Sequence, residues 1–131
     1  MSSPSPEQRE YAALLIAKAT GDQQAVHALA QAGVVDDVTG FHAQQAVEKA
    51  TKAVLVLAGV SLPHTHDLER LLALAAQAGS PPPPDVADAG WLTPWAVQFR
   101  YDEVVEPLDQ EAALATADAA LRWAVEAIES A

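Results

Sequence analysis

The segment 40–53 carries the side chains of this chain that are best arranged to bind an anion. Its apolar residues recur close to every 3.6 residues, which predicts a helix. One side of that helix carries Ala43, Ala46, Val47, Ala50, Ala53, Val54 and Leu57, and the opposite side carries Phe41, His42, Gln45, Glu48, Lys49 and Lys52. The second side gathers two of the chain's few lysines beside a histidine, a carboxylate and an amide.

Three interpretations of this polar side remain open. Gln45 and Lys49 are four residues apart, as are Glu48 and Lys52, and such pairs stabilise a solvated helix face. The same residues are suited to contact an anion or a nucleotide. Phe41 within the polar arc favours a contact surface, including a helix–helix face of a dimer, because an exposed aromatic side chain more often marks contact than solvation.

Two further polar groups lie downstream. His64, His66 and Asp67 resemble a metal-ligand set by residue type, but a helix start explains them more simply, with Thr65 as the cap and Asp67 facing the positive end of the helix dipole. Arg100, followed by Tyr101, stands among carboxylates. It is suited to an ion pair, for example with Glu48, or to bidentate binding of a phosphate.

Composition limits the function. The chain has 131 residues, 18 acidic against 7 basic side chains, and a net charge of −11, so nonspecific binding to nucleic acid is not expected. It has no cysteine, which excludes thiol chemistry and disulfides. No apolar run is long enough to span a membrane and the N-terminus lacks the pattern of a signal peptide, so we expect no membrane association and a cytoplasmic location. Glycine-rich phosphate loops, G-x-S-x-G and H-E-x-x-H are also missing.

The periodicity predicts an all-α, single-domain bundle of four to five helices over residues 1–131. The first helix is expected after the cap Ser5 and ends at Gly33, with a break or weak point at Gly21-Asp22 and an apolar stripe of Tyr11, Leu14 and Leu15. Further helices are expected over about 38–58, from Thr65 or His66 to Gly79, over about 86–99 with an internal cap at Thr93, and over about 109–129 with Leu114, Ala117, Leu121, Val125 and Ile128 as its apolar stripe. The proline-rich segment 80–84 is expected to be an internal loop.

Three blocks in order, 40–50, 65–68 and 99–101, resemble the HEPN family (higher eukaryote and prokaryote nucleotide-binding domain). Residues 17–22 are similar to the first-helix region of that family, so the resemblance covers nearly the whole chain. The resemblance implies an up-and-down helical bundle that commonly forms a homodimer. It also implies a minimal nucleotidyltransferase as partner, in a module similar to a toxin–antitoxin pair.

Many members of the wider superfamily are metal-independent ribonucleases, whose signature is an arginine followed after four to six residues by a histidine. Here Arg100 is followed by Tyr101-Asp102-Glu103-Val104-Val105-Glu106-Pro107, without a histidine. The mechanism would therefore lack its proton-transfer group, unless His42 or His66 supplied an imidazole from another helix.

The sequence thus favours a noncatalytic HEPN-type module without a cofactor that binds a nucleotide or another anion, or a nucleotidyltransferase. We assign no catalytic and no metal-binding residue, and the expected ligand-binding residues are His42, Gln45, Glu48, Lys49, Lys52, His66, Asp67, Arg100 and Tyr101. The alternatives are a divergent ribonuclease toxin and a purely structural dimeric bundle.

Overall fold

The computed structural model describes residues 3–33, 36–96 and 107–131. Its elements are α1 (Pro6–Ala32), α2 (Asp36–Leu57), α3 (Leu68–Gln77), α4 (Pro84–Ala87), the 3₁₀ helix η1 (Ala89–Ala96) and α5 (Gln110–Ser130). The described ranges contain no strand, which confirms the all-α helical bundle. None of their helices is both long and apolar enough to cross a bilayer.

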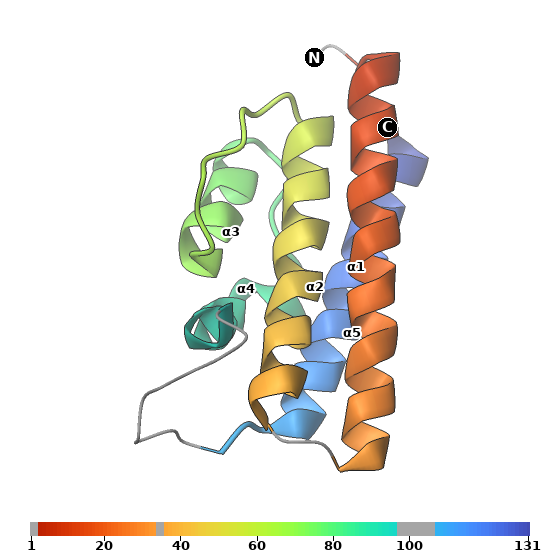
Figure 1. The fold of residues 1–131 in the computed structure, drawn as a ribbon. Coiled ribbons are helices and arrows are strands. Elements are labelled where there is room, and N and C mark those ends of the chain that lie inside the picture. Colours follow the sequence, from red (N-terminus) through yellow and green to blue (C-terminus); the bar gives the residue numbers. More distant parts are fainter. Residues whose placement is uncertain (1–2, 34–35, 97–106) are drawn as a thin grey trace.

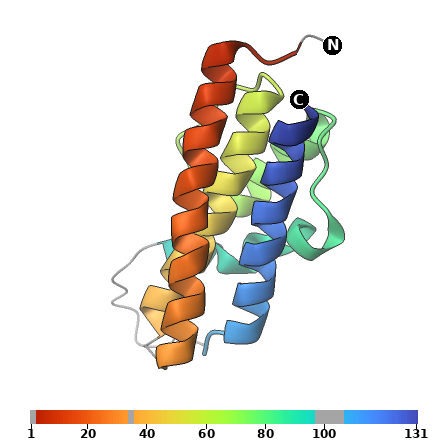
Figure 2. The ribbon, with the colours of Figure 1, turned by 90° about the vertical axis from the view of Figure 1, so that its right-hand side faces the viewer.

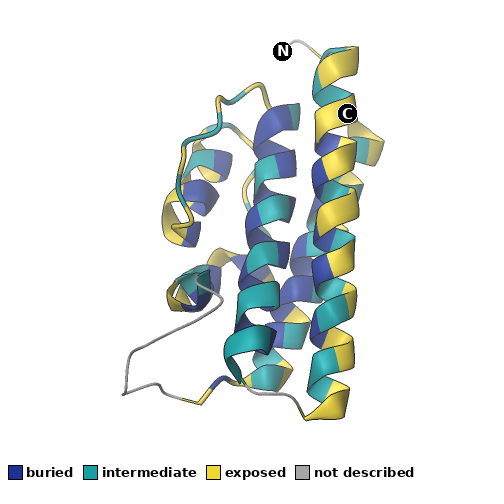
Figure 3. Cartoon of the chain, in the orientation of Figure 1, coloured by how far each residue is buried: buried dark blue, intermediate teal, exposed yellow. Residues whose placement is uncertain are grey.

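Helix α2 is the central element, because it contacts α1, α5, α3 and η1. Figures 1 and 2 show α1, α2 and α5 as three long helices lying side by side, with α1 antiparallel to the other two. The short elements α3, α4 and η1 cover α2 and α5 on the side away from α1 (Figure 1). An element covered on two sides has room for few exposed residues, and α2 is accordingly the most buried helix in Figure 3.

Helix α1 begins and ends as predicted and has no break. Ser5 and Gln8 form a reciprocal capping box, Pro6 occupies the first turn, and Gly33 ends the helix with a φ of 70°. Of the two alternatives expected at Gly21-Asp22, the break is wrong and the continuous helix is confirmed, because α1 runs over 27 residues. Asp22 faces the bundle and its carboxylate is held by side chains of α2, so tertiary contacts outweigh the weak helix propensity of this pair.

Two of the expected caps differ in the structure. The cap of α3 is Asp67 rather than Thr65, since its carboxylate accepts hydrogen bonds from the backbone N–H groups of Glu69 and Arg70. The Thr65 hydroxyl instead accepts the N–H of Asp67. Thr93 lies inside η1, and its hydroxyl accepts the N–H of Leu68 at 3.1 Å, which fastens η1 to the start of α3.

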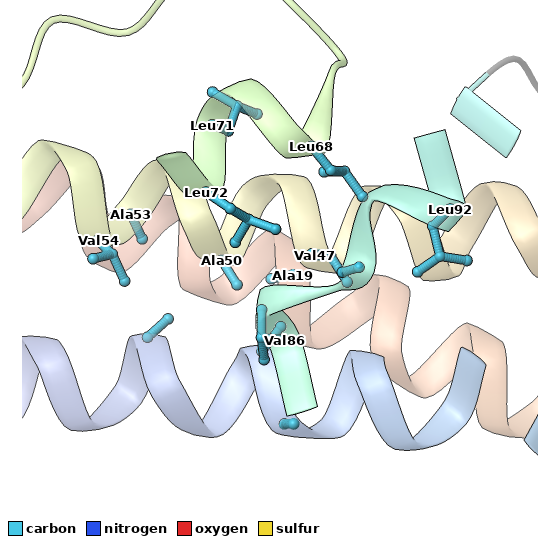
Figure 4. Packing of buried hydrophobic residues seen from close by; sticks show 14 of the residues in the cluster. Ala19, Val47, Ala50, Ala53, Val54, Leu68, Leu71, Leu72, Val86 and Leu92 are labelled. Atoms are coloured by element: carbon cyan, nitrogen blue, oxygen red, sulfur yellow. The ribbon is translucent and has the colours of Figure 1, made fainter. Parts of the chain in front are cut away.

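The core is built from small and branched apolar side chains around α2. Figure 4 shows Leu68 and Leu72 of α3 directed toward α2, near Val47 and Ala50. The expected stripe of α1 is partly wrong: Leu15 is buried, but Tyr11 and Leu14 are 47% and 51% exposed. Of the stripe expected in α5, Ala117 is buried and Leu114, Leu121 and Ile128 pack partly buried against the core. The fully buried side of the helix consists of Ala113, Thr116, Ala117, Ala119, Ala120 and Ala124. Small residues at these positions let α5 approach α2 closely, which leaves the larger residues partly exposed on its flanks.

One glycine makes the packing of η1 on α2 possible. A Cβ atom at Gly40 would lie 2.5 Å from Cε3 of Trp95, so the indole ring rests directly on the backbone of α2. Trp95 is only 6% exposed. The close approach therefore explains why a glycine stands in the first turns of a helix, where it is otherwise unfavourable.

Candidate functional site

The first polar group of the site joins α1 to α2. Asp22 is 8% exposed, and its two carboxylate oxygens have different partners. Nδ1 of His42 lies 2.8 Å from Oδ1, and Nζ of Lys49 lies 2.6 Å from Oδ2. We call Asp22, His42 and Lys49 the Asp22 group.

The second polar group joins α2 to the loop before α3. Glu48 is 4% exposed and accepts from Nε2 of Gln44 at 2.9 Å, Nζ of Lys52 at 3.0 Å and Nδ1 of His66 at 2.7 Å. Gln44 also donates to the backbone carbonyl of His66, so it fixes both the loop and the carboxylate. We call Gln44, Glu48, Lys52 and His66 the Glu48 group.

Gln45 connects the amide network to the outer surface. Its Nε2 donates to Oε1 of Gln44 at 2.7 Å, while the rest of its side chain is partly exposed on the polar arc of α2. The helix spacing places Gln45 between His42 and Lys49 on one side and Lys52 on the other. The two groups therefore form one continuous polar surface along α2.

Electrostatics keep Glu48 ionised in this setting. Burial alone would raise the pKa of Glu48, but hydrogen bonds from Gln44, His66 and Lys52, with the positive charge of Lys52, outweigh burial and lower the pKa. A carboxylate that stays ionised only accepts hydrogen bonds, so Nδ1 of His66 is the donor in their contact. The geometry thus fixes the orientation of the imidazole through the carboxylate.

The interpretation of the polar side as a simple solvated face is wrong for part of it. Glu48 is nearly as buried as the core, and Lys49 and Lys52 retain only 25% and 19% of their side-chain exposure. Periodicity alone cannot show this, because it detects the apolar side of α2 but not that α1 and the α3 segment enclose the flanks of the polar side.

Two residues of the site, Asp22 and Gln44, were not expected from the sequence. The buried residues of α1, Ala12, Leu15, Ala19, Asp22 and Val26, follow alternating spacings of three and four. A charged residue in such a series indicates a buried polar contact, and that signal was available for Asp22. Gln44, which is fully buried, has no comparable signal, because its place in the interior depends on how α3 packs.

One of the expected site residues, Asp67, does not join these two groups. Asp67 caps α3, and the hydrogen bonds that its carboxylate accepts come from the backbone N–H groups of Glu69 and Arg70. Arg100 and Tyr101 lie outside the described residues, as does the expected bridge from Arg100 to Glu48. Phe41 is partly buried and makes an edge-on contact with the ring of His42, with centroids 5.3 Å apart.

The described part of the chain holds no group of three or more His, Asp or Glu side chains arranged to take a metal ion. His66, one of the residues of the metal alternative, has its Nδ1 on Glu48 instead. The site's chemical capacity is thus that of two ammonium groups, two oriented imidazoles and an amide. Such groups bind phosphates and other oxyanions.

A hollow at the end of the bundle is separate from this surface. Its volume is about 410 Å³, and it is lined by residues near both termini and by Val54, Leu57, Ala78 and Gly79. None of its lining residues carries a charged side chain. We therefore assign the candidate anion site to the polar surface of α2 and not to this hollow.

Comparisons with known proteins identify the family. Neither the comparison with curated proteins nor that with solved structures returned a significant match. A family model does match, over residues 12–128, and it is that of the HEPN domain. The match spans α1 to α5 and includes both polar groups, and by it the chain belongs to the HEPN domain family.

Proposed function

We propose that this protein is a noncatalytic HEPN module that binds the phosphate groups of a nucleotide on the polar surface of α2. The ligand-contacting groups are His42, Gln45, Lys49, Lys52 and His66, and Glu48 orients two of them. Asp67 belongs to the site only through the position it gives α3, and Arg100 and Tyr101 are proposed members from the sequence alone.

The observation that carries the proposal is the fixed orientation of the two imidazoles. Nδ1 of each ring is held by a buried carboxylate, which leaves Nε2 of each ring without a hydrogen bond among the described residues. The His66 side chain is 66% exposed and that of His42 is 27% exposed, so solvent and ligands reach them. Binding groups that are already ordered lose little conformational freedom when a ligand arrives.

We also propose that the protein acts as a homodimer with a minimal nucleotidyltransferase as partner, in a module similar to a toxin–antitoxin pair. Membership of the HEPN family supports this proposal. Light scattering of the purified chain measures its mass in solution, and co-expression with a nucleotidyltransferase encoded beside it tests the pairing. A monomer at all accessible concentrations would contradict the dimer.

Calorimetric titration with ATP tests the ligand. We expect a saturable heat with the wild type and a weaker affinity in the Lys49→Ala variant. Arg122→Ala on α5 is the matched control, because it removes one positive charge away from the polar surface. Absence of heat at millimolar ATP, or an equal loss in both variants, would contradict the proposal.

A second candidate is a purely structural role for both groups. It is favoured by the pairing itself: each carboxylate and each ammonium group of the two groups has a partner within the chain, and no buried polar side-chain atom of the described residues lacks one. In that case the Lys49→Ala variant unfolds at lower urea concentration while no nucleotide binds. The titration and the unfolding curve together separate the two roles.

The ribonuclease alternative is tested in the same preparation. Incubation of the purified chain with total RNA, and expression of the chain alone in a host cell, would reveal cleavage or toxicity. If both occur and are lost in Arg100→Ala, the protein is a nuclease and the noncatalytic proposal is wrong.

A further inference from the structure

The two polar groups contain as much negative as positive charge when their imidazoles are neutral. In the Asp22 group one carboxylate faces the ammonium of Lys49, and in the Glu48 group one carboxylate faces the ammonium of Lys52. A phosphate that approaches either lysine therefore meets a carboxylate whose oxygen lies 2.6 Å (Lys49) or 3.0 Å (Lys52) from the same ammonium nitrogen. The attraction of the lysine is largely cancelled by that repulsion.

The imidazoles are the groups that change this balance. Among the described residues, the charged groups in contact with His42 are Asp22 directly and Lys49 through the shared carboxylate, and those in contact with His66 are Glu48 directly and Lys52 through the shared carboxylate. Protonation leaves Nδ1 of each ring on its carboxylate and adds a second donor at Nε2. Each protonation therefore adds one positive charge and one outward hydrogen-bond donor to the surface.

We infer that Asp22 and Glu48 are specificity-determining residues that make phosphate binding on the α2 surface depend on acid. The inference rests on the proposed function, because it concerns the same surface. While the imidazoles are neutral, the two carboxylates hold the affinity for polyphosphates low, and protonation of His42 and His66 raises it. Asp22 and Glu48 thus orient the binding groups and, by the same contacts, limit their affinity for anions.

The experiment is a titration with inorganic tripolyphosphate, which has no base or sugar, at about pH 6 and about pH 8, on either side of the histidine range. We expect the wild type to bind more tightly at the lower pH. The Asp22→Asn variant keeps an oxygen that accepts from His42 but loses the charge, so at the higher pH it binds about tenfold more tightly than the wild type. Glu48→Gln shifts the affinity in the same direction.

Asp118→Asn is the matched control. Asp118 of α5 also accepts from a histidine, His27 of α1, at 2.8 Å, and its removal changes the net charge by the same amount away from the α2 surface. We expect its effect to be under about twofold, since solvent screens distant charges. If the affinity for tripolyphosphate rose equally in all three variants, the net charge of the protein alone would explain the increase. That result would overturn the inference.

The double variant His42→Ala, His66→Ala supplies an independent readout, because tripolyphosphate itself loses negative charge toward pH 6 and the variant is therefore expected to show no gain in affinity at the lower pH. Melting curves confirm that each variant is folded. If wild-type binding is equal at both pH values, or if Asp22→Asn binds no more tightly, the inference fails while the proposed function stands. If neither tripolyphosphate nor ATP binds at either pH, the proposed function fails with it.

Discussion

His66 is anchored to Glu48 across the interface of α2 and the loop before α3, with 2.7 Å between Nδ1 and Oε1. The contact joins a mostly exposed ring to one of the most buried carboxylates in the described part of the chain. Glu48 thereby connects Lys52, one turn further along α2, with His66 in the loop 58–67. Its removal is expected to affect both stability and the shape of the surface.

Replacing Glu48 by alanine should lower the free energy of unfolding by about 2–4 kcal/mol, because it leaves the ammonium of Lys52 without its acceptor and the buried amide of Gln44 with one acceptor fewer. Urea unfolding followed by circular dichroism measures the change. Glu126→Ala, on the exposed side of α5, is the control and should stay within about 0.5 kcal/mol. Equal effects in the two variants would mean that the Glu48 group contributes no net stability.

Stability should fall on acidification through the range in which Glu48 is protonated. The pKa of Glu48 is lowered in the folded state, so between the ordinary glutamate pKa of about 4.3 and the lowered value the unfolded chain binds more protons. The stabilisation is therefore fully present above the unfolded pKa and is lost as the pH falls through the folded pKa. Asp118, whose pKa is lowered by Gln23 and His27 against the effect of burial, contributes in the same direction.

The free energy of unfolding measured from neutral pH down to about pH 3 tests this dependence, with Glu48→Gln as the comparison. The glutamine cannot titrate, so its curve should be flatter over the acidic range. A wild-type curve that runs parallel to that of the variant would show that Glu48 does not couple folding to protons.

Alanine at Gly40 should destabilise the protein by about 1–3 kcal/mol, although alanine is the better helix former. The added Cβ would lie 2.5 Å from the Trp95 ring, so η1 has to move away from α2. Gly21→Ala is a matched control, because no atom lies within 4 Å of its Cβ position and α1 is regular there. That variant should gain about 0.5–1 kcal/mol. If both variants are stabilised to the same extent, Trp95 does not rest on Gly40.

Asp67→Ala should cost about 0.5–2 kcal/mol through loss of the cap of α3. The Asp67 carboxylate accepts the N–H of Glu69 at 3.1 Å and that of Arg70 at 3.5 Å. Asp67→Asn retains an acceptor and should recover most of the loss. Should Asp67→Asn instead weaken nucleotide binding while the melting temperature stays unchanged, Asp67 contacts the ligand directly.

The helices were predictable from the sequence where local signals decide them. The start of α1 is marked by the capping box of Ser5 and Gln8, and its end by Gly33. Neither cap needs a tertiary contact. The continuity of α1 through Gly21 was not predictable in the same way. It depends on the contact of Asp22 with His42 and Lys49, and those residues lie 20 and 27 positions away.

The candidate site was predictable in its residues on α2 but not in their pairing. Helix periodicity places His42, Gln45, Lys49 and Lys52 on one side, and the spacing of Glu48 and Lys52 predicts their ion pair, which the structure contains. Which carboxylate meets Lys49 depends on how α1 docks on α2. The sequence pairs Lys49 with Gln45 by spacing, whereas the structure pairs it with Asp22.

The alanine-rich buried side of α5 determines which mutations the protein can accumulate. A large core residue can be replaced by a smaller one. An alanine at positions 113, 117, 119, 120 or 124 can become smaller only by substitution with glycine. Almost every substitution there adds volume against α2 or a neighbouring element, and a close-packed interior resists added volume. The natural variation of this helix should therefore concentrate on its exposed positions, such as Arg122 and Glu126, while its smallest residues stay fixed.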